Sequence, residues 1–460
     1  MAIKSVNPYT LETLKTFDEI TDSQLEKAID TAHDAYLDWK KTSYEDRAAL
    51  LNKIAATFRS KKKELSEMIT TEMGKLIGQS EYEIEYCANI FEYYAKNGAE
   101  FLADQKITTA VGEAVLTKAP IGVILAVEPW NFPFYQVARV VAPNLMIGNT
   151  IVLKHSSNVP QCAQAFEDIF TEIQAPKGLY TNLFLSSKKI EKLIENPKIQ
   201  GACLTGSEKA GASLAQFAGK NIKKSVLELG GNDPFIVLED ADIDRATDLA
   251  IKGRMINNGQ SCVASKRFIV LEQVADAFLE KFTKKMEALK LGDPMDKETQ
   301  LGPLSSQDAL DTLLEQVNTT IKQGATVVTG GKQANLKGAF MQPTILTDLK
   351  PDMLAYQEEL FGPVASFYRV KNDEEAIELA NATRFGLGSS IFSKDMERAK
   401  NMAKQIDSGM VFINQPTKSN ESLPFGGTKR SGYGRELSAL GMDEFVNKKL
   451  IHAVSETDIL

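Results

Sequence analysis

The spacing of hydrophobic residues divides the chain near residue 120. Between residues 21 and 104, apolar side chains recur at intervals of three and four positions, which is the period of an α-helix with one buried face. The pattern predicts helices over 22–39, 47–74 and 83–102, with an N-cap offered by residues 21–23. The first hundred residues are therefore expected to form a helical layer.

After residue 120, short apolar runs alternate with amphipathic segments. The runs read as buried parallel strands, and the segments between them read as helices. In a first block we expect strands at 121–130, 149–156, 181–186, 201–207 and 224–231, with helices at 159–173, 187–196 and 207–220. In a second block we expect strands at 234–240, 266–272, 326–331, 364–370, 389–393 and 409–414, with helices at 241–255, 274–290, 307–324, 373–382 and 396–406. Two doubly wound α/β domains follow, with ligands at the carboxyl ends of strands.

In two further segments, apolar and polar residues alternate, but the segments belong to neither block. Residues 107–118 have Gly112-Glu113 at their middle and predict an exposed hairpin, and 448–456 is again strand-like and could pair with it. The hairpin is interpreted either as a surface flap or as an arm that pairs with another subunit. The Gly230-Gly231 pair is the natural joint between the two α/β blocks.

Composition narrows the class of protein. The 460 residues are 43% hydrophobic and 25% charged, which is typical of a globular chain with about three domains or sub-domains. A net charge of -8 argues against binding to nucleic acid, whose phosphates attract basic surfaces. We find no secretory signal pattern and no apolar run near the ~20 residues of a membrane helix, so a cytoplasmic protein without a membrane partner is expected.

Cys262 is the best candidate nucleophile. The other three cysteines (Cys87, Cys162, Cys203) lie in apolar helix or strand patterns, whereas Cys262 lies in the polar, glycine-containing segment 257–267. The three histidines are far apart and lack metal-binding spacing, so no metal site is expected. For the same reason no histidine partner for the thiol is indicated.

Two further features could take part in the chemistry: Glu228 and the turn at 204–211. Glu228 ends an apolar run, where burial could raise its pKa and make it a general base, although a capping carboxylate is an equally good interpretation. The segment 204–211 follows a predicted strand and opens a helix, so Gly206, Ser207 and Gly211 could bind a pyrophosphate. Tight strand-to-helix turns use the same residues. The glycines at 432 and 434 follow no strand and are not interpreted as a phosphate loop.

Seven segments in order resemble the aldehyde dehydrogenase superfamily across nearly the whole chain: EPWNFP (128–133), LKHS (153–156), LTGS (204–207), LELGG (227–231), GQSC (259–262), EELFGPV (358–364) and LPFGGTKRSGYGRE (423–436). The resemblance implies a coenzyme-binding domain over 1–106 and 125–229 and a catalytic domain over 230–440. It further implies a bridging and oligomerisation element over 107–124 and 441–460. A homodimer or homotetramer is expected.

The resemblance also implies a mechanism. Cys262 would add to an aldehyde to form a thiohemiacetal, and Asn131 with the Cys262 backbone N–H would form the oxyanion hole. Hydride transfer to the nicotinamide would leave a thioester, and Glu228 would activate the water that hydrolyses it. Intact Cys262, Glu228 and Asn131 argue against a catalytically silent ligand-binding relative, and Glu228 argues against a CoA-acylating one.

The cofactor is expected to be NADP in preference to NAD. The positions that match the family's cofactor contacts are Trp130, Lys154, Gly206, Ser207, Gly211, Glu359 and Phe361. Strict NAD users resemble Lys-x-x-Glu where this chain has Lys154 and Ser157. A carboxylate at 157 would repel a 2′-phosphate, whereas a serine can donate a hydrogen bond and Lys154 supplies charge.

The substrate is expected to be a small aldehyde with a distal carboxylate. Arg139 and Ser419 match positions near the family's aldehyde pocket and could hold that carboxylate, although Arg139 could also be a structural helix residue. The short chain and the KHSS segment resemble compact bacterial succinate-semialdehyde dehydrogenases. Alternatives are a broad aliphatic or lactaldehyde-type dehydrogenase and, without a cofactor, a cysteine hydrolase. Ala264 stands where some relatives carry a second cysteine, so no local redox switch is expected.

Overall fold

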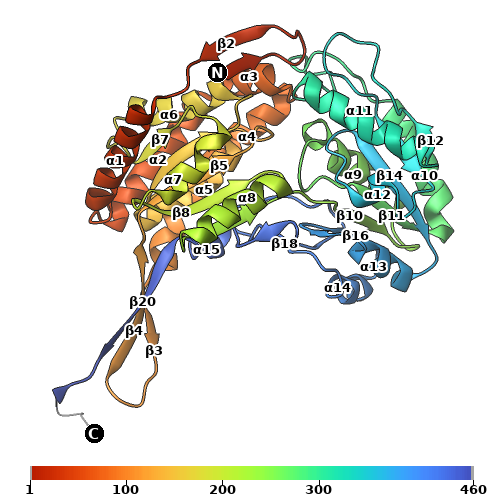
Figure 1. Cartoon of the computed structure of the whole chain (residues 1–460). Coiled ribbons are helices and arrows are strands. Elements are labelled where there is room, and N and C mark those ends of the chain that lie inside the picture. Colours follow the sequence, from red (N-terminus) through yellow and green to blue (C-terminus); the bar gives the residue numbers. More distant parts are fainter. Residues whose placement is uncertain (1–2, 457–460) are drawn as a thin grey trace.

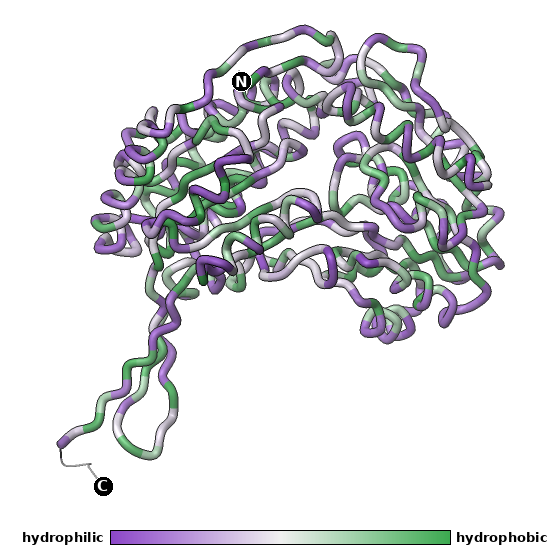
Figure 2. The backbone as a smooth tube through the Cα atoms, in the orientation of Figure 1, coloured by the Kyte–Doolittle hydropathy of each residue, from purple (hydrophilic) through white to green (hydrophobic). Residues whose placement is uncertain are grey.

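The computed structural model describes residues 3–456 and shows two α/β lobes with a narrow arm projecting from one of them (Figure 1). The most hydrophobic stretches of the backbone run through the lobes, whereas hydrophobic and hydrophilic residues alternate in the arm (Figure 2). The ends of the expected ranges 1–106 and 441–460, at residues 1–2 and 457–460, lie outside the described residues. No helix within 3–456 is long and apolar enough to cross a membrane.

The predicted helical layer is present. It consists of α1 (Asp22–Trp39), α2 (Tyr44–Ser60), α3 (Lys62–Met73) and α4 (Ile77–Phe101). Thr21 and Ser43 form capping boxes at the starts of α1 and α2, and Gly74 ends α3 in a left-handed conformation with φ of 80°. Buried residues of α2, α3 and α4 pack into one hydrophobic core with the first sheet.

The first sheet has the order β19-β9-β8-β5-β6-β7 and is parallel except for β19. Its strands are β5 (Val123–Glu128), β6 (Thr150–His155), β7 (Tyr180–Asn182), β8 (Ile199–Thr205), β9 (Lys224–Glu228) and β19 (Gly432–Tyr433). The helices between them are α5 (Tyr135–Ile147), α6 (Pro160–Glu172), α7 (Ile190–Glu195) and α8 (Glu208–Lys220), with the short η1 (Ser187–Lys189) before α7. The carboxyl ends of β5, β6, β8 and β9 thus share one edge.

The second sheet has the order β12-β13-β14-β11-β10-β16-β17 and is parallel except for β12. Its strands are β10 (Pro234–Val237), β11 (Arg267–Leu271), β12 (Thr326–Thr329), β13 (Thr344–Thr347), β14 (Val364–Val370), β16 (Ser390–Phe392) and β17 (Phe412–Ile413). The associated helices are α9 (Ile243–Met255), η2 (Ile256–Gly259), α10 (Glu272–Glu287), α11 (Gln307–Lys322), α12 (Leu354–Gln357), α13 (Asp373–Asn381) and α14 (Met396–Ala403), whereas α15 (Ser438–Gly441) follows β19 and lies against α4 in the first lobe. The doubly wound α/β prediction is confirmed for both blocks.

The arm is a three-stranded antiparallel sheet of β3 (Gln105–Ile107), β4 (Glu113–Pro120) and β20 (Val446–Ala453). The predicted pairing of the last strand with the hairpin is confirmed, because β20 pairs with β4 from Val446 opposite Pro120 to Ala453 opposite Glu113. Leu450 and Ile451, which point to opposite faces, are 60% and 53% exposed. The arm therefore has no hydrophobic core of its own.

Several predicted bounds were wrong for identifiable reasons. The expected strands 181–186 and 409–414 shrink to the three residues of β7 and the two of β17, because both lie at sheet edges with one neighbour each. We did not predict β1 (Ile3–Val6), β2 (Thr13–Phe17) or β13, nor the two-residue pair of β15 (Phe385–Gly386) with β18 (Thr428–Lys429). These strands are only two to five residues long, too short for periodicity to mark them.

Candidate active site

The two sheets face each other across the segment that carries Glu228 and Cys262. Glu228 is the last residue of β9, at the carboxyl edge of the first sheet, and Cys262 lies five residues before Arg267, the first residue of β11. The carboxyl edge of the first sheet thus meets the amino edge of the second. The Gly230-Gly231 joint crosses this gap, and a Cβ added at Gly231 would lie 2.6 Å from the Cys262 carbonyl oxygen. Glycine is required there by the close approach of the two backbones.

The turn before Cys262 is held in an unusual conformation. Asn257 and Asn258 have φ of 51° and 57°, and Gly259 follows with φ of 81°. Asparagine is among the residues that tolerate this left-handed region best, and each such non-glycine residue costs about 1–3 kcal/mol. The surrounding bonds offset that cost: Arg254 donates to the Gly259 and Ser265 carbonyls, and Lys266 Nζ donates to the Cys262 carbonyl at 2.7 Å.

The Cys262 thiol is partly exposed but poorly hydrated. Burial raises its pKa to about 12, while the positive charges of Lys266 and Arg139 lower the pKa and the carboxylates of Glu359 and Asp233 raise it. The group is consequently a thiol near neutral pH. It needs a proton acceptor within the same cavity in order to attack.

Glu228 is a buried carboxyl without hydrogen-bond partners among the described residues; both of its oxygens are unpaired. Burial raises its pKa well above the ordinary value, nearby Glu436 raises the pKa further, and Arg139 lowers it. A Cβ at Gly426 would lie 2.7 Å from Glu228 Oε1, so this glycine leaves the space that the carboxyl occupies. Glu228 lines the same cavity as Cys262, which is the arrangement that a general base requires.

Asn131 reaches the cysteine turn from the other lobe. Its Nδ2 donates to the Gln260 carbonyl at 3.2 Å, and its own carbonyl accepts from Asn257 Nδ2 at 2.6 Å. The Asn131 amide therefore lies at the Gln260 carbonyl, and Gln260 is two residues before Cys262 in the chain.

A fully buried ion pair between Lys75 and Glu83 fixes the segment that follows Asn131. Glu83 Oε1 accepts the backbone N–H groups of Phe134 and Tyr135 at 2.9 and 3.1 Å, which caps the start of α5, and Lys75 Nζ lies 3.8 Å from the centre of the Phe132 ring. A buried ion pair contributes little net stability but costs much to break. We infer that its value lies in positioning residues 131–135.

A cavity of about 290 Å³ extends from Cys262 along the carboxyl edge of the first sheet. Of the residues that match cofactor positions, Trp130, Gly206, Ser207, Glu359 and Phe361 line it. Ser207 caps α8, whose N-terminal N–H groups face this edge, and the Trp130 and Phe361 rings meet edge to face at 5.8 Å. Gly211 lies within α8 against Leu229 and does not line the cavity. The helix N-terminus and the two aromatic walls fit a dinucleotide.

Lys154 and Ser157 mark the outer end of that edge. Lys154 is the next-to-last residue of β6, and Ser157 is exposed two residues after the strand ends. Neither side chain has a hydrogen bond or ion pair within residues 3–456. Burial lowers the pKa of Lys154. An unpaired ammonium and a free hydroxyl at the end of a strand fit a phosphate group.

A second cavity of about 360 Å³ meets Cys262 from the opposite direction. Five aromatic residues contribute to its walls (Tyr82, Tyr86, Phe132, Tyr135, Phe425), and Arg139 and Ser419 also line it. The Arg139 guanidinium is fully buried: Nε is paired with Glu436, and Nη2 donates to Thr205 Oγ1 at 3.1 Å. Arg139 thus reaches the cavity but is already committed to partners in the protein.

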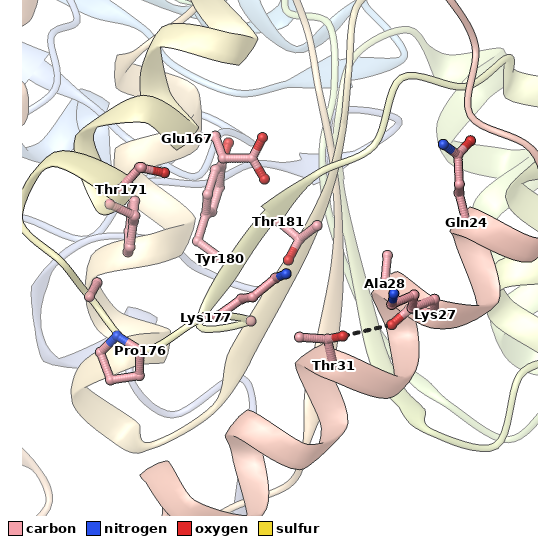
Figure 3. A pocket seen from close by; sticks show the side chains of 13 residues that line it. Gln24, Lys27, Ala28, Thr31, Glu167, Thr171, Pro176, Lys177, Tyr180 and Thr181 are labelled. Carbon is pink, nitrogen blue, oxygen red and sulfur yellow. Dashed lines mark hydrogen bonds between the residues drawn. The ribbon is translucent and has the colours of Figure 1, made fainter.

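A further cavity of about 570 Å³ lies away from the thiol. It lies between α1, α6 and the segment before β7, and residues such as Lys27, Glu167 and Lys177 line it (Figure 3). Thr31 bonds back to the Lys27 carbonyl of its own helix there. None of the candidate catalytic residues takes part in it.

The sequence did not identify Glu436, Glu128, Glu83 or Lys75 as parts of this site. Glu83 could have been suspected, because it is a charged residue on the buried stripe of α4, in line with Cys87. Glu128 and Glu436 carried no such signal, since nothing in the sequence shows that both approach Arg139. No group of three or more histidine, cysteine or acidic residues able to hold a metal occurs in the described part of the chain.

Comparisons with known proteins are consistent across the whole length. The model of the aldehyde dehydrogenase family matches residues 1–451. The chain is 49% identical over 449 residues to an NADP⁺ succinate-semialdehyde dehydrogenase of Deinococcus radiodurans, covering 98% of this chain and 94% of that protein. It is 46% identical over 454 residues to a protein of the same name in Mycobacterium tuberculosis, covering 98% and 99%. The crystal structure of succinic semialdehyde dehydrogenase from Streptococcus pyogenes in complex with NADP⁺ superimposes with a TM-score of 0.97 at 46% identity, covering 99% and 100%.

Proposed function

The chain belongs to the aldehyde dehydrogenase family, and we propose that it oxidises succinate semialdehyde to succinate with NADP in preference to NAD. The observation that carries the proposal is the meeting of two cavities at Cys262, one with the features of a dinucleotide site and one lined in part by aromatic side chains and by Arg139. The names of the relatives from Deinococcus radiodurans and Streptococcus pyogenes support the same substrate and cofactor.

In the proposed mechanism, Cys262 Sγ attacks the aldehyde carbon and the new S–C bond gives a thiohemiacetal. The Asn131 amide and the Cys262 backbone N–H stabilise its oxyanion. NADP, when bound in the smaller cavity, supplies the acceptor for the hydride. Glu228 accepts a proton from the water that hydrolyses the resulting thioester, and it is also placed to accept the thiol proton.

Cofactor choice is assigned to Lys154 and Ser157. Lys154 would pair with a 2′-phosphate and Ser157 would donate a hydrogen bond to it, while Trp130, Gly206, Ser207, Glu359 and Phe361 would hold the rest of the dinucleotide. Glu359 Oε1 is already 3.0 Å from Lys266 Nζ and accepts the Gly231 N–H at 3.3 Å, so its position is fixed before any ligand binds. Arg139 and Ser419 are assigned to the end of the substrate cavity that receives the distal carboxylate.

The domain roles are proposed as follows. Residues 1–106 and 125–229 bind the coenzyme, 230–440 form the catalytic domain, and 107–124 with 441–460 form the oligomerisation element. The exposed apolar side chains on the arm support a homodimer or homotetramer, because a sheet without a core of its own is stabilised by a partner. The cytoplasm is the proposed compartment, in keeping with four free cysteines.

Steady-state kinetics on a panel of aldehydes with both cofactors test the proposal. We expect kcat/KM to be highest for succinate semialdehyde with NADP. A higher value for lactaldehyde or uncharged aliphatic aldehydes would favour a broad-specificity enzyme. Product that forms only with CoA, or ester hydrolysis without cofactor reduction, would overturn the proposed reaction.

A further inference from the structure

We propose that Asn257 is a positioning residue of the active site. Its amide joins the Asn131 loop of the first lobe to the cysteine turn of the second, and so aligns the two donors of the oxyanion hole. Gln79 holds Asn257 in the conformation that this bridge requires. The inference deepens the proposed function and rests on it, because it presupposes an oxyanion bound by the Asn131 amide and the Cys262 backbone N–H.

The Asn131 side chain is oriented by the backbone carbonyl of Gln260. Asn131 Nδ2 donates to that carbonyl at 3.2 Å. Because an amide nitrogen carries two hydrogens and the amide oxygen carries none, the end that faces the carbonyl must be the nitrogen. One hydrogen is used for Gln260, and the other is left for an oxygen of the substrate. The direction of this oxyanion donor thus depends on where the cysteine turn presents the Gln260 carbonyl.

The amide of Asn257 ties the same two segments together. Its Nδ2 donates to the backbone carbonyl of Asn131 at 2.6 Å and to the backbone carbonyl of Gln260 at 3.0 Å. Both acceptors are main-chain atoms, so a shift of either segment would break a hydrogen bond. All three residues are buried, where such bonds are stronger than in water. The bridge therefore holds the loop that carries one oxyanion donor against the turn that carries the other.

The conformation of Asn257 carries a cost in free energy. Its φ of 51° lies in the left-handed region, and its Oδ1 is buried without a hydrogen-bond partner in the described part of the chain. Strained backbone and unpaired buried polar groups are concentrated at functional sites. Gln79 offsets part of the cost, because its Oε1 accepts the Asn257 backbone N–H at 2.8 Å from the first turn of α4.

Asn258 offers a matched control. It is the next residue in the chain, has φ of 57° and is also buried. Its Nδ2 donates to the carbonyls of Gly74 and Pro303 at 2.9 and 3.0 Å, and its Oδ1 accepts the Gly302 N–H at 2.8 Å. These bonds anchor the turn but do not reach Asn131. The two asparagines thus separate anchoring of the turn from alignment of the oxyanion hole.

The test compares Asn257→Gly with Asn258→Gly, because glycine adopts left-handed backbone without strain and removes only the amide. Asn257→Gly is expected to lower kcat for succinate semialdehyde about 10- to 100-fold, less than the loss of an oxyanion donor itself. The burst of NADPH absorbance should slow by the same factor, and KM for NADP should not change. Asn258→Gly should lower Tm at least as much and leave kcat within about threefold of wild type.

Gln79 gives a second pair of variants, which decides the question if Asn257→Gly does not fold. Gln79→Met removes the acceptor for the Asn257 N–H and should lower kcat in the same way but less strongly. Gln79→Glu keeps an acceptor oxygen at the same place and should retain more of kcat than Gln79→Met, each measured at its own pH optimum. Equal losses in the two Gln79 variants would overturn the role of this bond.

A double variant shows whether Asn257 acts through Asn131. In the Asn131→Ala background, Asn257→Gly should lower kcat/KM by less than about threefold, because the donor that it aligns is already gone. Losses that multiply would overturn the proposal, as would equal losses of kcat in Asn257→Gly and Asn258→Gly.

The proposed function fails by different results. If wild type does not reduce NADP with succinate semialdehyde, the proposed reaction is wrong and the inference falls with it. If Asn131→Ala keeps the kcat of wild type, the proposed oxyanion hole is wrong, and the bridge has nothing to align. If both of these results are as proposed and Asn257→Gly keeps full kcat, only the role of Asn257 is overturned.

Discussion

The two cavities that meet at Cys262 differ in how their charged groups are used. On the cofactor side, Lys154 and Ser157 lie near the surface without partners in the described chain. On the substrate side, Arg139 is paired with Glu436 and Lys75 with Glu83, and all four are buried. The cofactor side thus offers an unpaired ammonium, whereas the buried charges on the substrate side are already paired and only the exposed Lys418 adds a further charge to that cavity.

The difference follows from the cost of burying charge. An unpaired cation in a buried cavity would lose its solvation and shift its pKa, so a buried charge is retained there only with a counter-ion. Lys154 is half-buried, so burial lowers its pKa, but it keeps enough contact with solvent to need no counter-ion. The 2′-phosphate of the cofactor and the distal carboxylate of the substrate are accordingly expected to be recognised by different means.

The largest effect is expected for Glu228→Gln, because Glu228 lines the cofactor-side cavity with Cys262 and is the proposed general base. Loss of the general base should lower kcat about 10²–10⁴-fold. Because Glu228 is also placed to accept the thiol proton, the first turnover should slow as well, and rapid mixing with aldehyde and NADP should give a slower burst of NADPH absorbance than in wild type. A variant with full steady-state turnover would contradict the assignment.

The pH dependence of kcat should report the same residue. Glu228 acts as a base only when ionised, and burial raises its pKa above the ordinary value near 4.3. Activity should consequently be low at acidic pH and rise as the pH increases through the raised pKa. In a pH–rate profile, Glu228→Gln should lose this rising limb; a limb that persists would belong to another group.

Breaking the buried Lys75–Glu83 pair on the substrate side should lower the stability of the protein. Lys75→Met leaves Glu83 ionised and unpaired, which is expected to destabilise the protein by about 3–5 kcal/mol. The double variant Lys75→Met with Glu83→Gln should recover much of the loss, because no uncompensated charge remains. Thermal denaturation of wild type, single and double variants measures the difference. Equal Tm values for single and double variants would contradict the argument.

A smaller effect is expected on the cofactor side, where Ser157 is exposed. Ser157→Glu should shift the ratio of kcat/KM for NADP over NAD toward NAD by about tenfold, a modest change because solvent screens the repulsion. Arg139→Ala should raise KM for succinate semialdehyde more than for butanal and leave the cofactor ratio unchanged. A change of that ratio in Arg139→Ala would show that the two sides are coupled.

Local patterns in the sequence predicted the architecture and much of the site. Helical and strand periodicity placed both α/β blocks, and the setting of Cys262 among polar residues distinguished it from Cys87, Cys162 and Cys203. The fixed positions of Glu228 and Asn131 near it depend on contacts between lobes, which no local pattern encodes. The Arg139–Glu436 pair joins residues almost 300 positions apart.

The structure of the segment around Gly432 also could not be predicted from a local pattern. Its glycines were not interpreted as a phosphate loop, and its role as the antiparallel edge strand β19 was not predicted. A Cβ at Gly432 would lie 1.9 Å from the Leu227 carbonyl oxygen, so glycine is needed for close strand pairing. A two-residue strand has no periodicity to recognise.

That pairing also sets an order of events during synthesis. Glu228 lies opposite Gly432 in the sheet, so the strand that carries the general base waits for a neighbour made 204 residues later. At about 5–20 residues per second the ribosome needs on the order of 10–40 s to make that stretch. The first lobe can form its helices and central strands in that time, but the wall beside Glu228 is completed only as the end of the chain emerges. A nascent chain released early should therefore be folded in large part and still inactive.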